Sequence, residues 1–104
     1  MNKYGEITLC NVVVSRDAIN QAVETLVDTQ TIQCVIDSIG RSEWLIAQQG
    51  GYQAEIVAKV FAASYNREPK ARYNGKLYVI YRTYQDGDSL ELYLGERIGE
   101  LHGN

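Results

Sequence analysis

The side chains that could carry chemistry in this chain are few, and their spacing fits no common reaction centre. Hydrolysis and group transfer need a nucleophile beside a base, but the chain has one histidine, His102, and no Ser-His or Cys-His spacing that suggests such a pair. It contains neither a phosphate-binding glycine loop nor a histidine-based metal motif. The sequence therefore predicts no catalytic residue, no metal site and no cofactor, and we expect the protein not to be an enzyme.

Two groups of acidic residues could suggest calcium binding or acid–base catalysis. Asp86 and Asp88 flank Gly87, but a calcium loop needs further oxygen ligands and a closing glutamate at fixed offsets, so a turn is expected here. The second group alternates with leucines, as on the solvated face of a strand, and consists of Glu91, Glu96 and Glu100.

An aromatic and basic run, with Tyr78, Tyr81, Arg82 and Tyr84, resembles the base-stacking platforms of proteins that bind single-stranded nucleic acid. On a strand, Tyr78 and Tyr84 share one face while Tyr81 points to the other, so they do not form a single stacking surface. The chain is also acidic, with 10 Lys and Arg against 13 Asp and Glu and a net charge of -3. We therefore expect core tyrosines and tyrosines between subunits.

The two cysteines, Cys10 and Cys34, are too few for a disulfide framework and lack the spacing of a zinc or redox motif. Both have apolar neighbours, which favours buried small hydrophobic side chains. The sequence leaves open whether they lie close together in space.

The length of 104 residues suits one domain, which we expect to span residues 1–104 without a linker or repeat. No apolar run approaches the roughly 18 residues that cross a bilayer, and the first ten residues do not resemble a secretory signal. We expect the chain to start in the cytoplasm, with no membrane partner.

The first third of the chain permits two readings. Residues 6–14 (EITLCNVVV) form a predicted strand. After Ser15 the apolar spacing fits a helix capped by Ser15 or Asp17, but residues 23–39 are rich in Val, Ile and Thr and alternate in strand period. Residues 52–64 fit a strand as well as a helix.

The other elements are clearer. Ser42 can cap a helix of about two turns that Gly50 and Gly51 would end. Asn74 and Gly75 predict a type I′ hairpin turn before a strand at residues 76–84, and a turn at residues 86–88 precedes a strand at residues 89–96.

These motifs, in this order, resemble the head closure or head-tail connector (head-tail adaptor) family of tailed phages and prophages of Gram-positive bacteria. The fragments that carry the resemblance are residues 6–9 (EITL), 17–25 (DAINQAVET), 42–44 (SEW) with Ala47 and Gly51, 65–66 (YN), 73–76 (YNGK), 78–84 (YVIYRTY), 90–94 (LELYL) and 96–97 (ER).

The resemblance implies a mainly β fold, a small antiparallel β-barrel or sandwich with one short helix. It makes residues 17–21 a turn and residues 52–64 a strand. The family usually has Gly where this chain has Asn20, and asparagine also tolerates positive φ. At Trp44 the family more often has Phe or Tyr, which supply a similar apolar face.

The function implied by the resemblance is that of a structural virion protein. About twelve copies are expected to close into a ring by head-to-tail contacts. The ring would lie between the portal-adaptor protein above and the tail-terminator protein below, retain the packaged DNA and dock the tail. DNA would pass through the lumen without sequence-specific binding. The protein would reside at the head–tail interface of the virion and, before assembly, in the bacterial cytoplasm, where it can be monomeric.

In this family the segment between the long second and third strands projects towards the channel, and here it covers about residues 41–52. Trp44 either contacts a neighbouring subunit or covers the barrel's own core. The residues expected in this channel-facing segment and in contacts between copies are Arg41, Ser42, Glu43, Trp44, Gln48, Gln49, Gly50, Gly51 and Tyr52.

Two functions of other classes remain as alternatives. One is a small phage-encoded binding or inhibitor protein that would be monomeric or dimeric. The other is a single-strand nucleic-acid binder on an OB-like barrel, which requires Tyr78, Arg82 and Tyr84 to share one basic face.

Overall fold

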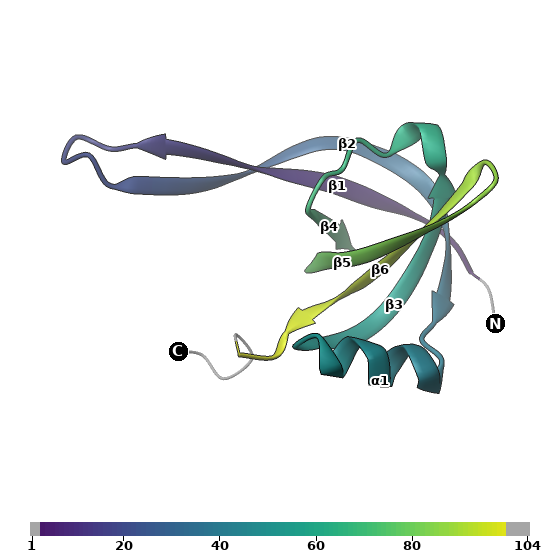
Figure 1. Cartoon of the computed structure of the whole chain (residues 1–104). Helices are drawn as coiled ribbons and strands as arrows, with labels where there is room; N and C mark the ends of the chain where they lie inside the picture. Colours follow the sequence, from purple (N-terminus) through teal and green to yellow (C-terminus); the bar gives the residue numbers. More distant parts are fainter. Residues whose placement is uncertain (1–2, 100–104) are drawn as a thin grey trace.

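Six antiparallel strands form a closed barrel in the order β1-β2-β3-β6-β5-β4, and β4 pairs with β1 to close the ring (Figure 1). This computed structural model describes residues 3–99. The elements are β1 (Lys3–Arg16), β2 (Ala22–Ser38), α1 (Arg41–Gln49), β3 (Tyr52–Phe61), the 3-10 turn η1 (Ala62–Ser64), β4 (Lys70–Tyr73), β5 (Lys76–Asp86) and β6 (Ser89–Arg97). The predicted mainly β barrel with one short helix is confirmed.

The barrel interior is filled by side chains that alternate along the strands, because successive residues of a strand point to opposite faces. On β6, Leu90, Leu92 and Leu94 point inward, between the partly exposed Glu91 and Tyr93. The buried cluster consists of Ile7, Leu9, Cys34, Ile36, Ala58, Val60, Ala71, Tyr78, Leu90, Leu92 and Leu94. Glu100 and His102 lie outside the described residues.

The prediction of a helix after Ser15 is wrong, because these residues belong to a β-hairpin. β2 pairs with β1 from Ala22 opposite Arg16 to Ile36 opposite Lys3. The many β-branched residues of this segment suit a strand, and the long pairing outweighs the helical spacing of its apolar residues.

The turn at residues 17–21 is confirmed. The Asp17 carboxylate accepts hydrogen bonds from the backbone N–H groups of Ile19 and Gln21, at 3.0 and 2.9 Å. Asn20 has a φ of 65°, the left-handed conformation that asparagine tolerates.

The remaining turns and the third strand also match their predictions. Asn74 and Gly75 have φ values of 53° and 79° between β4 and β5, and Gly87 has a φ of 62° between β5 and β6. Residues 52–61 form β3, which resolves the earlier ambiguity in favour of a strand. The strand is three residues shorter than expected, because η1 follows it.

A long two-stranded arm extends from the barrel (Figure 1). β1 pairs with β4 only at residues 8–10, and β2 pairs with β3 only at residues 35–38. Among residues 3–99, residues 11–16 therefore pair only with residues 22–27, and we call residues 11–27 the arm. Five of its large apolar side chains are exposed, namely Val13, Val14, Ile19, Val23 and Val27, whereas Val12 and Leu26 are partly buried.

Candidate interaction surfaces

Helix α1 occupies the predicted position, between β2 and β3. Its N-cap is Gly40, whose carbonyl accepts the Trp44 N–H at 3.0 Å, and no side chain of the described residues caps the helix. The predicted cap, Ser42, is wrong, because the helix begins at Arg41, two residues before the start that a cap at Ser42 implies, and Ser42 lies inside the first turn. Its predicted end is confirmed: Gly50 donates to the carbonyls of Ile46 and Ala47, and Gly51 has a φ of 89°.

Helix α1 exposes three consecutive large apolar side chains beside its exposed polar ones. Only Ala47 is buried, whereas Trp44, Leu45 and Ile46 are 38%, 50% and 52% exposed. Trp44 does not belong to the buried cluster of the barrel. The helix thus presents three large apolar side chains that can contact another molecule.

One ion pair attaches the first turn of α1 to β5. Arg82 donates from Nε to both carboxylate oxygens of Glu43, at 3.2 and 3.1 Å, and also contacts Oε1 through Nη2. Tyr81 donates its hydroxyl hydrogen to Glu43 Oε2 at 2.8 Å. The hydrogen bond from Arg82 outweighs burial and lowers the pKa of Glu43 below its ordinary value.

An aromatic cluster surrounds this ion pair. The Tyr81 ring stacks on Tyr52 with centroids 5.3 Å apart, and the Arg82 guanidinium lies 4.0 Å from the centroid of Tyr93. Burial, and secondarily a hydrogen bond to Glu91, raises the pKa of Tyr93 to about 12. Tyr52 and Glu43, both predicted site residues, are thus brought together with residues of β5 and β6.

The predicted faces of the β5 tyrosines need a correction. Tyr78 is in the core and Tyr84 is exposed, so they do not share a face, because a bulge between Ile80 and Arg82 shifts the alternation. The expectation that the tyrosines form no single stacking surface is confirmed. The buried position of Tyr78 also removes the shared face that the nucleic-acid alternative required.

The ionisation of Glu43 should make the attachment of α1 to the barrel depend on pH. Because its pKa is lowered in the folded protein, its contribution to stability is present above the unfolded value, about 4.3, and is lost as the pH falls through the folded value. We expect the fluorescence of Trp44, the only tryptophan, to change below about pH 4 as α1 loosens.

In Glu43→Gln this fluorescence change should be absent, and the signal at neutral pH should already resemble that of the acidified wild type. Far-UV circular dichroism separates loosening of α1 from unfolding of the barrel. Identical titrations of wild type and variant would contradict the assigned role of Glu43.

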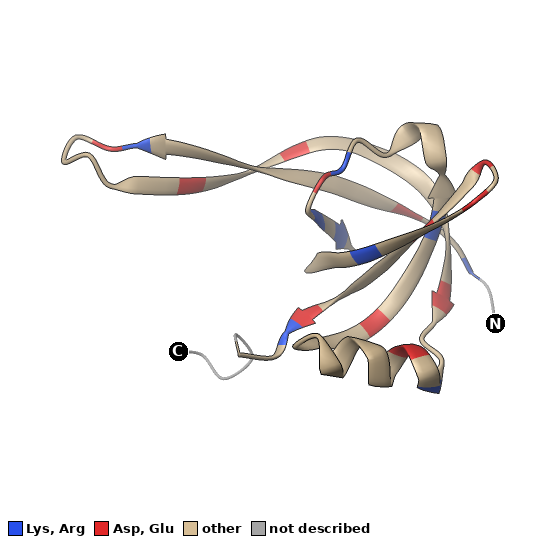
Figure 2. Cartoon of the chain, viewed as in Figure 1, with Lys and Arg blue, Asp and Glu red and all other residues tan. Residues whose placement is uncertain are grey.

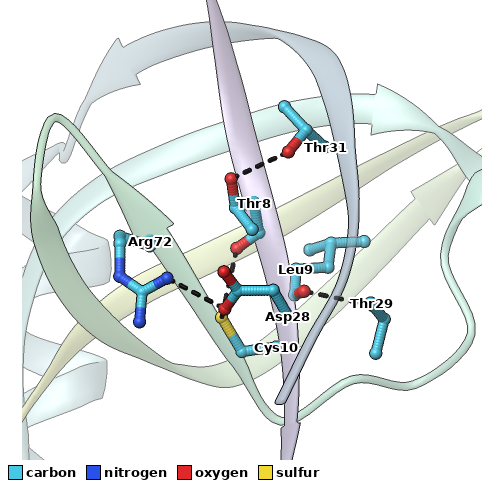
Figure 3. Close-up of polar contacts among 7 residues, drawn as sticks. All are labelled: Thr8, Leu9, Cys10, Asp28, Thr29, Thr31 and Arg72. Atoms are coloured by element: carbon cyan, nitrogen blue, oxygen red, sulfur yellow. Dashed lines mark hydrogen bonds and ion pairs between the residues drawn. The ribbon is translucent and has the colours of Figure 1, made fainter. Parts of the chain in front are cut away.

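A cluster of hydrogen-bonded polar side chains lies at the base of the arm (Figure 3). Asp28 accepts hydrogen bonds from Arg72 Nη1 at 2.9 Å and from the Cys10 thiol at 3.4 Å. Burial and the neighbouring Asp28 raise the pKa of the Cys10 thiol, which disfavours the thiolate. Cys10 and Cys34 are both buried and free, as predicted, but the hydrogen bond of Cys10 was not foreseen.

The sequence reasoning also missed Glu68, a buried carboxylate that is 2% exposed. It accepts hydrogen bonds from Thr29 Oγ1 at 2.7 Å, Gln30 Nε2 at 3.1 Å and the Asn66 N–H at 2.8 Å. Burial alone would raise the pKa of Glu68, but these hydrogen bonds outweigh it and lower the pKa. Glu68 thereby connects the loop before β4 to β2. The only feature of the sequence that marked this position was Pro69, which directly follows Glu68 and restricts its backbone conformation.

Charged residues are spread over the barrel and the arm, with both signs interspersed in this view (Figure 2). Among residues 3–99, no group of three or more His, Cys, Asp or Glu side chains is placed to hold a metal ion. The same residues include no helix with the length and apolarity to cross a membrane.

Comparison with known proteins adds no family assignment. No protein-family model matches the chain, and no curated protein sequence matches it.

Proposed function

We propose that this chain is a structural subunit of a phage head–tail connector that assembles into a head-closure ring. The observation that carries the proposal is the presence of two separate groups of exposed apolar side chains, one on the arm and one on α1. A ring built by head-to-tail contacts needs two different surfaces on each copy. The order of sequence motifs supports the same assignment.

In this proposal α1 and the following glycines form the segment that faces the channel. With a single buried residue, α1 can change position without unfolding the barrel once the ion pair between Glu43 and Arg82 is released. Gly51, with its positive φ, is the hinge on the β3 side. Movement of this segment would open the ring for DNA.

The charge of the chain is compatible with this role. A net charge of -3 favours weak binding of the phosphates of passing DNA. The ring would contact the portal-adaptor protein on one side and the tail-terminator protein on the other. The chain would thus act as a structural protein of the virion and not as an enzyme.

Two measurements test the proposal. Mass spectrometry of purified phage particles should detect the chain at the head–tail interface, and negative-stain electron microscopy of the concentrated protein, or of the protein mixed with its adaptor, should show rings. Absence from particles would refute the assignment. Salt-sensitive retention of single-stranded DNA in a gel shift would favour the nucleic-acid alternative instead.

A further inference from the structure

The two edges of the arm are open for pairing. Within the described part of the chain, residues 11–16 of β1 and 22–27 of β2 pair only with each other. A two-stranded ribbon is marginally stable alone, and an unpaired edge invites another strand. The two free stretches, NVVVSR and AVETLV, contain no proline and one formal charge each. The arm therefore offers an edge on each side to a partner strand.

A second copy of this chain fits both edges at once. In a ring, neighbouring copies are related by rotation, so arms that lie side by side place β2 of one copy beside β1 of the next. These two strands run in opposite directions, as β1 and β2 do within one copy, so they can form an antiparallel ladder. Repetition around the ring leaves no arm edge unpaired.

The charges of the two edges are complementary. Arg16 is the only charged residue in the free stretch of β1, and Glu24 is the only one in that of β2. They lie on the same face of the arm, because Arg16 is opposite Ala22 and Glu24 is opposite Val14. Pairing of unlike edges brings opposite charges together, whereas pairing of like edges brings equal charges together.

One register matches the charge and polarity of the side chains that face each other between the two arms. A stagger of two residues relative to the pairing within the arm places Glu24 opposite Arg16 of the next copy. The same register pairs Thr25 with Ser15, Leu26 with Val14, and Val27 with Val13 of that copy. Polar side chains then face polar ones and apolar side chains face apolar ones.

We propose that the arms of neighbouring copies pair edge to edge, β2 of one with β1 of the next, into a continuous antiparallel sheet around the ring. This inference rests on the proposed ring and names the contact that closes it.

Cysteine crosslinking tests the register. Ser15→Cys and Thr25→Cys are prepared separately and mixed before mild oxidation; within one chain Ser15 faces Val23 and Thr25 faces Val13, so neither variant can form an internal disulfide across the arm. Directly opposite residues lie at a distance that a disulfide can span. We expect several-fold more crosslinked dimer from the mixture than from either variant alone.

A second mixture, Val14→Cys with Leu26→Cys, samples the alternate type of ladder site, so that one mixture tests the more favourable geometry. The native Cys10 and Cys34 are buried and compete little. Crosslinks confined to like variants, or none up to millimolar protein, would overturn the arm pairing.

Charge reversal tests the contact between neighbouring arms independently of crosslinking. Arg16→Glu or Glu24→Arg should weaken each arm contact by a factor of about two to five, and the double reversal should restore it. Thermal unfolding of the monomers checks that the fold is unchanged. Rings in virions without arm crosslinks would reject this pairing and leave the proposed function standing, whereas arm crosslinks in a protein absent from virions would reject the proposed function alone.

Discussion

Replacing Gly95 with alanine is expected to lower the free energy of unfolding by about 3 kcal/mol. A Cβ atom at this position would lie 2.3 Å from the Gln53 carbonyl oxygen and 3.2 Å from the Ala54 Cα. Both neighbours are backbone atoms of β3, so a side-chain rotation cannot relieve the contact. The strands β3 and β6 would have to separate at the point where they pair.

Urea denaturation followed by circular dichroism measures this loss. Gly99→Ala is the matched control, because a Cβ there meets no atom of residues 3–99 within 4 Å. The control should unfold at the wild-type midpoint. An unchanged midpoint for Gly95→Ala would show that the strands can adjust at this site without cost.

Removal of the buried carboxylate by Glu68→Ala is expected to cost about 2–4 kcal/mol of unfolding free energy. The substitution leaves Thr29, Gln30 and the Asn66 N–H without their acceptor. Glu68→Gln keeps the size of the side chain but turns an NH₂ group towards one of these donors, so its loss should be intermediate.

Denaturation at neutral pH with Glu6→Ala as the exposed control tests this role. Because the pKa of Glu68 is lowered in the folded state, the stability difference between wild type and Glu68→Ala should shrink as the pH falls below about 4. If the stability difference stays constant across that pH range, Glu68 stabilises the fold through packing and not through its charge.

The turns and the end of α1 could be predicted from the sequence, because they depend on the types of a few neighbouring residues. Positive φ at Asn20, Asn74 and Gly87 follows from residue type, and the end of α1 follows from Gly50 and Gly51. The assignment of residues 22–38 was ambiguous until pairing with β1 was known, since helical and strand periods coexist there. The predicted start of α1 was two residues too late, because the cap is Gly40, which has no side chain to signal it.

The sequence by itself determined the β-rich character, the positions of the turns and the short helix, because turn residues and alternation act over a few neighbouring positions. The tertiary structure alone decided the closure of the barrel, the long free arm and the contact of Glu43 with Arg82, a residue 39 positions away. It also placed Tyr78 and Tyr84 on opposite faces through a bulge, and buried Glu68 among donors from β2. These features depend on which strands meet and in which register, and pairing between distant segments leaves no pattern within either segment alone.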